Sequence, residues 1–387
     1  MKRSQFISST ALIMAITVLS GCRNKSTVAD GASSKTQPTP VEETVVGGLQ
    51  EPVSLVFLSN DIMLVAERRA GRIRWVEHGK LRDEPFATVP VPTVSGYNEH
   101  GLLGLAVDPD YPSSPYVYAF HTVPNQSGRP SGQEVVRFTV KDGKGVDERV
   151  IVGNLPASTG CCHDGGRILF GADDRLYVSL GDTMHQELAQ DYDALPGKIL
   201  RYNDDGSVPD DNPYELQKVI DSSVDSDTPA PSQRTPVYTL GHRNVFGMAV
   251  NPATGGIYVT ENGPDRDDEI NYLAAGDNYG WPEVVGLSSD ARFHQPLWVS
   301  GKTTIAPTGA VVYSGTIFSQ YRGDLLFAAY KDGNLRRVVF DGPEKVSRVD
   351  VIGAARDHAR LDVAMSPDGL IYYSSMDTVY RLVPAKR

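Results

Sequence analysis

The chain has 387 residues, a hydrophobic fraction of 40% and a charged fraction of 22%, which are the proportions of an ordinary soluble globular protein. Its formal net charge is −11 and no basic stripe runs along it, which excludes the concentrated basic surface that nucleic-acid-binding proteins need. An anionic cofactor remains compatible with this charge, because the charge of a pocket matters more to a small ligand than the sum over the chain.

The N-terminus has the features of an export signal. The basic pair Lys2-Arg3 precedes a short apolar run over residues 11–19, which is too short to span a bilayer. The run ends in Leu19-Ser20-Gly21-Cys22, which resembles the bacterial lipobox. We therefore expect residues 1–21 to be a lipoprotein signal peptide. The alternatives are an uncleaved anchor and a plain secretory signal.

The lipobox places the mature protein outside the cytoplasm. Cys22 would be acylated and become the first residue, so that lipid alone anchors the chain to a bacterial membrane, in the periplasm or at the cell surface. Residues 22–44 are rich in Ser, Thr, Lys, Pro and Gly, with almost no large apolar side chain. This composition predicts a disordered tether ahead of a folded domain over residues 45–387.

From Val45 onward, short alternating apolar segments are interrupted by Gly, Pro, Asp or Asn, which predicts an all-β domain. The one modest helix candidate is residues 186–193. A unit in which a turn precedes a Tyr- or Val-rich strand recurs about six times. Its copies begin at Ser59, Asp108, Gly171, Asn251, Arg322 and Ser366.

Six copies of one strand unit predict a six-bladed β-propeller, because a two-sheet sandwich, the main competing fold, does not explain the repetition. The irregular spacing of the copies predicts long insertions between strands, around residues 188–232 and 286–304. Insertions on one face of a propeller commonly form a pocket.

Four polar, glycine-containing segments stand out within this strand-rich context. They are Asn98-Glu-His-Gly-Leu-Leu-Gly, Cys161-Cys-His-Asp-Gly-Gly-Arg, Gly241-His-Arg-Asn and Asn262-Gly-Pro-Asp-Arg-Asp-Asp-Glu-Ile-Asn. Together with Leu180-Gly-Asp, Gly197-Lys-Ile-Leu-Arg and Gly276-Asp-Asn-Tyr-Gly-Trp-Pro, they give the span from Gly47 onward a resemblance to the glucose/sorbosone dehydrogenase family. That resemblance implies a six-bladed propeller that binds pyrroloquinoline quinone (PQQ) and calcium and oxidises aldoses.

The resemblance also implies roles for individual residues. His163 matches the general base that takes a proton from the anomeric hydroxyl of the sugar, and imidazole suits this role near neutral pH. Arg243 matches an arginine beside the reacting quinone carbonyl, where its charge stabilises negative charge on oxygen. The alternative for Arg243 is a structural ion pair. Asn244 is its neighbour in the motif, and Glu99 matches a residue at the rim of the active site.

Further matches concern the cofactor and calcium. Lys331 matches a lysine that contacts the cofactor, and its alternative is a surface lysine at a blade edge. Gly263 and Pro264 would bind calcium through their carbonyl oxygens, which are ligands that this hard cation prefers. Glu269 and Tyr279 match positions at a second, structural calcium. We expect Asp268 to accept hydrogen bonds from loop amides instead.

With Cys22 acylated, the remaining cysteines are the neighbours Cys161 and Cys162. An exported protein is exposed to oxidation, so we expect a disulfide between them that stiffens the turn carrying His163. The alternative is a pair of buried thiols that fill space.

One departure from the family concerns its Arg-x-Arg-Asp pattern, whose arginines meet the cofactor carboxylates. The corresponding residues here are Ala359-Arg360-Leu361-Asp362, with Arg360 between the two expected positions. The candidates to replace the pair are Arg336, Arg356 and Arg360. Binding of PQQ that is weaker, differently anchored or absent is also compatible with the change.

The sequence therefore predicts a PQQ- and calcium-dependent enzyme that oxidises an aldose at its anomeric carbon to the lactone. Its partners would be a sugar substrate and a respiratory electron acceptor. Two alternatives remain open, a non-catalytic propeller that binds a glycan or a protein, and a calcium-dependent hydrolase of the lactonase type. Propellers support many functions, so the fold alone does not choose among them.

Overall fold

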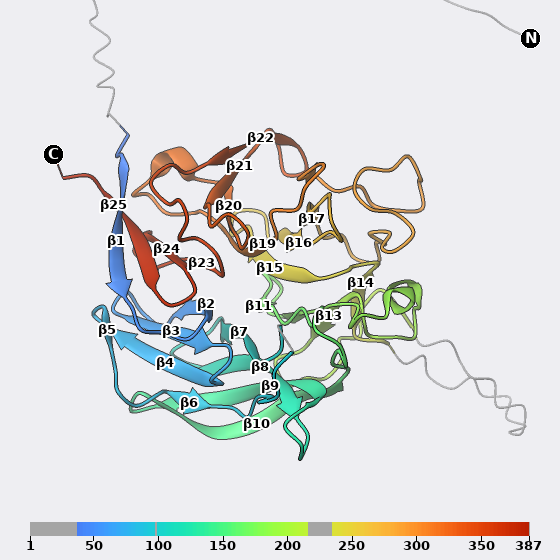
Figure 1. The fold of residues 1–387 in the computed structure, drawn as a ribbon, viewed down its shortest axis with the longest axis horizontal. Helices are drawn as coiled ribbons and strands as arrows, with labels where there is room; N and C mark the ends of the chain where they lie inside the picture. Colours follow the sequence, from blue (N-terminus) through green and yellow to red (C-terminus); the bar gives the residue numbers. More distant parts are fainter. Residues whose placement is uncertain (1–36, 97–98, 216–233, 387) are drawn as a thin grey trace, which may run out of the picture. The chain divides into compact units, whose positions relative to one another are not determined.

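The computed structural model describes residues 37–96, 99–215 and 234–386. These residues form six antiparallel sheets arranged around a centre, each a blade of a β-propeller (Figure 1). The predicted all-β, six-bladed fold is confirmed. The expected signal peptide, Cys22 and most of the expected tether lie outside the described residues.

The first three blades follow one another along the chain. Blade 1 contains β2 (Pro52–Phe57), β3 (Ile62–Glu67), β4 (Arg72–Glu77), β5 (Lys80–Leu81) and β6 (Ala87–Thr88). Blade 2 contains β7 (Leu102–Val107), β8 (Tyr116–Pro124), β9 (Pro130–Lys141) and β10 (Lys144–Leu155). Blade 3 contains β11 (Ile168–Phe170), β12 (Leu176–Leu180), β13 (Lys198–Tyr202) and β14 (Val237–Leu240).

The last three blades close the ring. Blade 4 contains β15 (Val245–Val250), β16 (Ile257–Glu261), β17 (Glu269–Tyr272) and β18 (Trp298–Val299). Blade 5 contains β19 (Pro307–Val312), β20 (Leu325–Ala329), β21 (Arg336–Phe340) and β22 (Val346–Val351). Blade 6 contains β23 (Val363–Met365), β24 (Ile371–Ser374), β25 (Val379–Pro384) and, from the other end of the chain, β1 (Pro40–Val46).

Pairing between β1 and β25 closes the propeller, because it joins the two ends of the domain in one sheet (Figure 1). The register runs from Pro40 opposite Pro384 to Val46 opposite Val379. The folded domain therefore begins at least five residues before the predicted start at Val45. The composition of residues 40–44 concealed this strand, since its side chains are mostly polar and its partner is distant in sequence.

Each of the six repeated units forms the second strand of a blade, namely β3, β8, β12, β16, β20 and β24. The turn before β24 shows why the unit begins with polar residues and glycine. Ser366 Oγ accepts a hydrogen bond from the amide of Leu370 (3.1 Å), and Gly369 has a φ of 89°, which glycine adopts without steric cost. The strands that follow these turns are buried.

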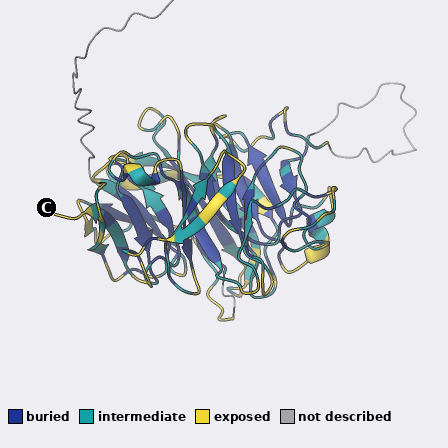
Figure 2. Cartoon of the chain, turned by 90° about the horizontal axis from the view of Figure 1, so that it is seen from above, coloured by how far each residue is buried: buried dark blue, intermediate teal, exposed yellow. Residues whose placement is uncertain are grey.

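Apolar side chains form a cluster between each pair of neighbouring blades. The burial view shows the same arrangement, with buried strands inside and exposed residues mainly in the connecting loops (Figure 2). The innermost strands contact their neighbours in the cyclic order β2, β7, β11, β15, β19 and β23. The ring of inner strands positions the loops that carry the polar segments.

The predicted insertions are divided by strands. The range 188–232 contains β13, and the range 286–304 contains β18. The helix candidate at residues 186–193 is a short 3₁₀ helix, η1 (Gln186–Gln190), and a second one is η2 (Ser319–Tyr321). Within the described residues, no helix has the length and apolar character to cross a membrane.

Candidate functional site

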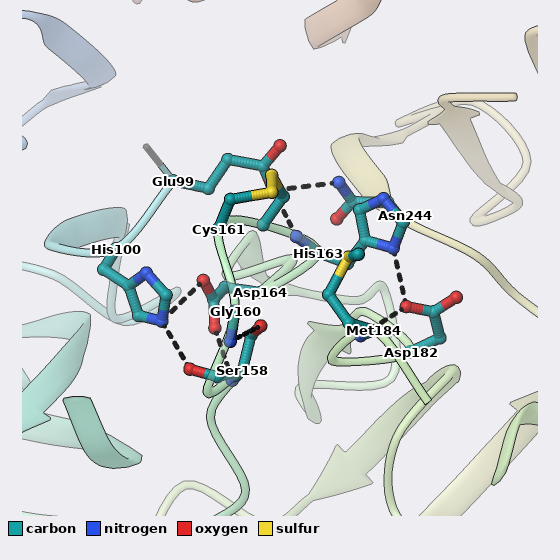
Figure 3. The surroundings of a disulfide bond; sticks show 11 residues. Glu99, His100, Ser158, Gly160, Cys161, His163, Asp164, Asp182, Met184 and Asn244 are labelled. Atoms are coloured by element: carbon teal, nitrogen blue, oxygen red, sulfur yellow. Dashed lines mark hydrogen bonds and ion pairs between the residues drawn. A yellow bond between two sulfur atoms is a disulfide. The ribbon is translucent and has the colours of Figure 1, made fainter. Parts of the chain in front are cut away.

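His163 lies in the loop between β10 and β11, in a backbone conformation with a φ of 71°. The neighbouring Cys161 and Cys162 form a disulfide, and their Cα atoms are 3.7 Å apart. The amide of His163 donates to Glu99 Oε2 (2.5 Å), which also accepts from Asn244 Nδ2 (3.0 Å) (Figure 3). Glu99 and the disulfide together fix the backbone that carries the histidine.

The imidazole of His163 is oriented by Asp182, in the loop after β12. Nδ1 of His163 lies 2.6 Å from Oδ1 of Asp182 (Figure 3). The other oxygen of Asp182 accepts a hydrogen bond from Nε1 of Trp281 (2.9 Å). Because a carboxylate oxygen accepts hydrogen bonds, Asp182 favours the tautomer in which Nδ1 carries the proton and Nε2 can accept one. This pair has the arrangement of a general base and the group that orients it.

Arg243 extends from the loop between β14 and β15. Its Nη1 donates to the carbonyl of Asn262 (2.9 Å), and its guanidinium lies over the ring of Trp281, 5.4 Å from the centroid. Its Nε is buried without a hydrogen-bond partner among the described residues. Burial lowers the pKa of Arg243, against the opposing charges of Asp182 and Glu261. An unpaired buried donor of this kind is suited to an anionic or carbonyl ligand.

These groups surround one cavity of about 600 Å³, which falls within the usual range for small-molecule sites. Its polar wall includes Glu99, His163, Arg243 and Asn244, from loops of different blades. Its apolar wall includes Val53, Phe246, Leu361 and Met376. The cavity can therefore receive a partly apolar small molecule that carries polar groups.

A smaller cavity of about 10 Å³ adjoins it and shares Arg243 and Asn262. Its lining includes Gly263, Pro264, Glu261, Glu269 and Tyr279. Burial and the charge of Glu261 raise the pKa of Glu269 to about 8. The buried carboxyl group of Glu261 and the half-buried one of Glu269, beside backbone oxygens, form a donor set of the kind that a hard cation prefers.

The neighbouring Asp268 plays the structural part predicted for it. Its Oδ1 accepts from the amide of Gly263 (3.0 Å), and its Oδ2 accepts from the amides of Ile305 (2.5 Å) and Ala306 (3.0 Å). No group of three or more His, Cys, Asp or Glu side chains in the described part of the chain is placed to bind a metal. A cation beside Glu269 would therefore also need backbone oxygens.

The segment around Asp362 links several blades at the centre of the propeller. Asp362 Oδ1 forms an ion pair with Arg167 Nη1 (3.2 Å), and its Oδ2 accepts from the amide of Leu55 (2.7 Å). Arg167 in turn donates to the carbonyls of Phe246 (2.5 Å) and Leu361 (3.0 Å). These contacts join inner strands of several blades.

Comparison with known proteins identifies the chain. The glucose/sorbosone dehydrogenase family model matches residues 49–382. The chain belongs to this family. Its curated relatives include the aldose sugar dehydrogenase YliI of Escherichia coli K12, which is 29% identical over 345 residues, covering 85% of this chain and 88% of the relative.

Solved structures agree with the family assignment. An oxidoreductase of Thermus thermophilus, described as a glucose dehydrogenase, is 36% identical with a TM-score of 0.75, covering 89% of this chain and 100% of the other. The PQQ-bound aldose sugar dehydrogenase of Streptomyces coelicolor is 28% identical with a TM-score of 0.72, covering 89% and 99%. Family membership makes the chain a sugar dehydrogenase, as the sequence predicted.

Within the family framework, the structure brings most predicted site residues together and leaves others aside. Lys331 does not line the large cavity. Its amine contacts the hydroxyl of Thr304, while the neighbouring Tyr330 lines the cavity. The sequence interpretation assigned no role to Asp182 or Glu261, although Leu180-Gly-Asp was part of the resemblance. Their roles depend on contacts between distant loops, which spacing along the chain does not reveal.

Proposed function

We propose that this protein oxidises an aldose at its anomeric carbon to the lactone, using PQQ and calcium. The observation that carries the proposal is that His163, oriented by Asp182, lines the same cavity as the half-buried guanidinium of Arg243. Family membership supports the choice of a sugar as substrate. The PQQ-bound relative supports the choice of cofactor.

The large cavity fits PQQ in size and in the chemistry of its walls. Arg243 offers an unpaired buried donor, Asn244 is fixed by its bond to Glu99, and apolar side chains are available to cover the rings. When bound, PQQ supplies a quinone that accepts a hydride, the redox step that amino-acid side chains do not provide.

The catalytic work of the chain would fall on three residues. His163 takes the proton of the anomeric hydroxyl on Nε2, because Nδ1 is engaged with Asp182. Asp182 keeps the ring in this orientation and stabilises the imidazolium that forms. Arg243 holds a positive charge at the cavity wall, where it stabilises negative charge that develops on a ligand oxygen.

Calcium would bind beside the same wall. Gly263 and Pro264 offer carbonyl oxygens, and Glu269 and Tyr279 line the same small cavity, which has room for about one small ion. A cation there would offset the repulsion between the carboxyl groups of Glu261 and Glu269. The segment 261–269, which lines this small cavity, includes Asn262. The carbonyl of Asn262 accepts a hydrogen bond from Arg243, so the segment joins the small cavity to the wall of the large one.

The proposal extends to the location of the protein. Cleavage after residue 21 and acylation of Cys22 would leave a tether from residue 22 and anchor the enzyme outside the cytoplasm. Electrons from the sugar would then pass to a respiratory acceptor. Mass spectrometry of the mature N-terminus tests this part, because a diacylated or triacylated Cys22 supports it and an unmodified or uncleaved N-terminus contradicts it.

Activity measurements separate the enzymatic alternatives. The protein reconstituted with PQQ and calcium should reduce an artificial electron acceptor when aldoses are added. The apoprotein with calcium alone should not hydrolyse sugar lactones. The opposite pattern would replace the dehydrogenase with a hydrolase, and inactivity in both assays with retained glycan binding would favour a binding module.

A further inference from the structure

The cations that line the large cavity are not those expected from the last blade. Among the described lining residues they are Arg68, Arg69 and Arg243. Arg243 lies beside His163 in the wall described above. Arg68 and Arg69 come instead from the turn between β3 and β4 of blade 1. A tricarboxylate such as PQQ needs charge partners for carboxylates that lose water on binding.

One carboxylate aligns the two arginines. Glu51 Oε2 lies 2.5 Å from Nη2 of Arg68, and Glu51 Oε1 accepts from Nε of Arg69 (2.9 Å). Arg68 also donates through Nη1 to the carbonyl of His100 (3.1 Å). A guanidinium has five N–H donors, and these contacts use only part of them. The pair retains one positive charge beyond the charge of Glu51, together with free donors at the cavity wall.

The backbone holds this pair in place. The carbonyl of Arg68 accepts from the amide of Leu102 (3.0 Å), and the amide of Gly71 closes the turn on the carbonyl of Glu67 (3.0 Å). The side chain of Arg68 is 11% exposed, whereas that of Arg69 is 62% exposed. Arg68 is therefore a fixed part of the wall, and Arg69 can reorient toward a ligand at the rim.

Glu51, which pairs with both arginines, lies where blade 1 meets blade 6. The amide of Glu51 donates to the carbonyl of Met376 (2.9 Å), and Met376 and Leu361 line the same cavity. Leu361 belongs to the segment Ala359–Asp362, in which the expected arginine pair is absent. Blade 1 thus supplies positive charge to the same cavity that blade 6 lines with the uncharged Leu361.

The other candidate cations are engaged elsewhere. Arg360 donates to the carbonyls of Tyr330 (2.6 Å) and Lys331 (3.3 Å), and Arg336 pairs with Asp332 (2.5 Å). Arg356 is exposed. Neither these three arginines nor Lys331 is among the described residues that line the cavity.

We propose that Arg68 and Arg69 bind the carboxylates of the anionic quinone cofactor, in place of an arginine pair on the last blade. Arginine suits this role because its planar guanidinium can bind a carboxylate through two parallel hydrogen bonds. Glu51 keeps the two guanidinium groups together before the cofactor arrives. This inference rests on the proposed function, since it names how that cofactor is held.

The test compares the affinity of PQQ for wild-type protein, Arg69→Gln, Arg69→Lys and Arg360→Gln, in calcium, by isothermal titration calorimetry. Arg69 is exposed, so its substitution should leave the melting temperature of the apoprotein unchanged. We expect Arg69→Gln to weaken PQQ binding about tenfold or more, and Arg69→Lys to restore part of the loss. Arg360→Gln, the matched control, should remain within about twofold of wild type.

The trimethyl ester of PQQ provides the second arm, because it keeps the rings and lacks the carboxylate charges. Wild type and Arg69→Gln should bind the ester with equal affinity, which a general distortion of the cavity would not produce. The inference is overturned if wild type binds PQQ while Arg69→Gln binds it equally well. If wild type does not bind PQQ at all, the proposed function itself fails.

Discussion

The two ends of the large cavity are built differently. At the end formed by blades 2 to 4, His163, Asp182 and Asn244 are fixed by hydrogen bonds between loops. At the end formed by blades 1 and 6, Arg68 and Arg69 are held by ion pairs with one glutamate. Proton transfer requires one position within hydrogen-bond reach, whereas a carboxylate can be bound by cations from several segments.

This difference explains why the sequence predicted one end better than the other. The motifs around His163 and Arg243 are local, and each carries its chemistry in adjacent residues. The charge at the other end comes from a hairpin turn whose arginines look like ordinary surface residues in the sequence. Substitutions at each end of the cavity test this difference.

The largest expected effect is at the end that carries the chemistry. His163→Gln should lower kcat for aldose oxidation by about 10³- to 10⁴-fold, because an amide side chain cannot take the proton of the anomeric hydroxyl. Calorimetric affinity for PQQ should change less than about threefold. A variant that retains most of its activity would remove His163 from the proposed mechanism.

Asp182→Asn should lower kcat by about 10²- to 10³-fold, because an amide can no longer fix the tautomer that leaves Nε2 free to accept a proton. The affinity for PQQ is the distinguishing measurement, since a variant that has lost only the orientation of His163 should bind PQQ within about threefold of wild type. A fall in activity with an equal fall in PQQ affinity would make Asp182 a structural residue.

A substitution at Asp362 tests whether the ion pair at the centre of the propeller stabilises the fold. Asp362→Asn leaves Arg167 buried without its ion-pair partner and should lower the free energy of unfolding by about 3 kcal/mol. Urea denaturation of the apoprotein measures this loss. Arg348→Gln, which breaks an exposed ion pair with Asp350, is the control and should cost less than about 1 kcal/mol. Equal losses in the two variants would contradict the structural role.

A smaller effect, on the pH dependence of the free energy of unfolding, is expected from Asp164 and His100, a buried pair next to the loop that carries His163. Asp164 Oδ2 lies 3.2 Å from Nε2 of His100 (Figure 3). Burial raises the pKa of Asp164 to about 8 and lowers the pKa of His100. The folded pair therefore keeps one proton up to about pH 8, whereas the unfolded chain loses its histidine proton near pH 6.5.

The sign of the pH dependence follows from these protons. Between about pH 6.5 and 8 the folded state binds more protons than the unfolded state. The free energy of unfolding should therefore fall by up to about 2 kcal/mol as the pH rises through this range. Urea denaturation at about pH 6.5, 7.2 and 8.0 measures it. Asp164→Asn should remove most of this slope, and an unchanged slope would contradict the assignment of the retained proton to Asp164.

The fold was largely predictable because each blade repeats a local signal, a polar turn followed by an apolar strand. The strand β1 escaped prediction because Glu42, Glu43 and Thr44 break the apolar alternation of a typical strand and its partner lies at the far end of the chain. In the site, Glu261 escaped for a similar reason. It lies at the end of a buried strand. Its carboxylate accepts a hydrogen bond from the amide of Arg243 and contacts Nδ1 of His242, and both residues come close to it only after folding.

The central claim is that the large cavity binds PQQ and passes it the electrons of a sugar. The most direct measurement is an anaerobic absorbance titration of the apoprotein with PQQ in calcium, followed by addition of an aldose mixture. Saturable binding near one equivalent, with bleaching of the quinone spectrum that depends on both sugar and His163, is the predicted result. An unchanged spectrum and melting temperature at micromolar PQQ would contradict the account.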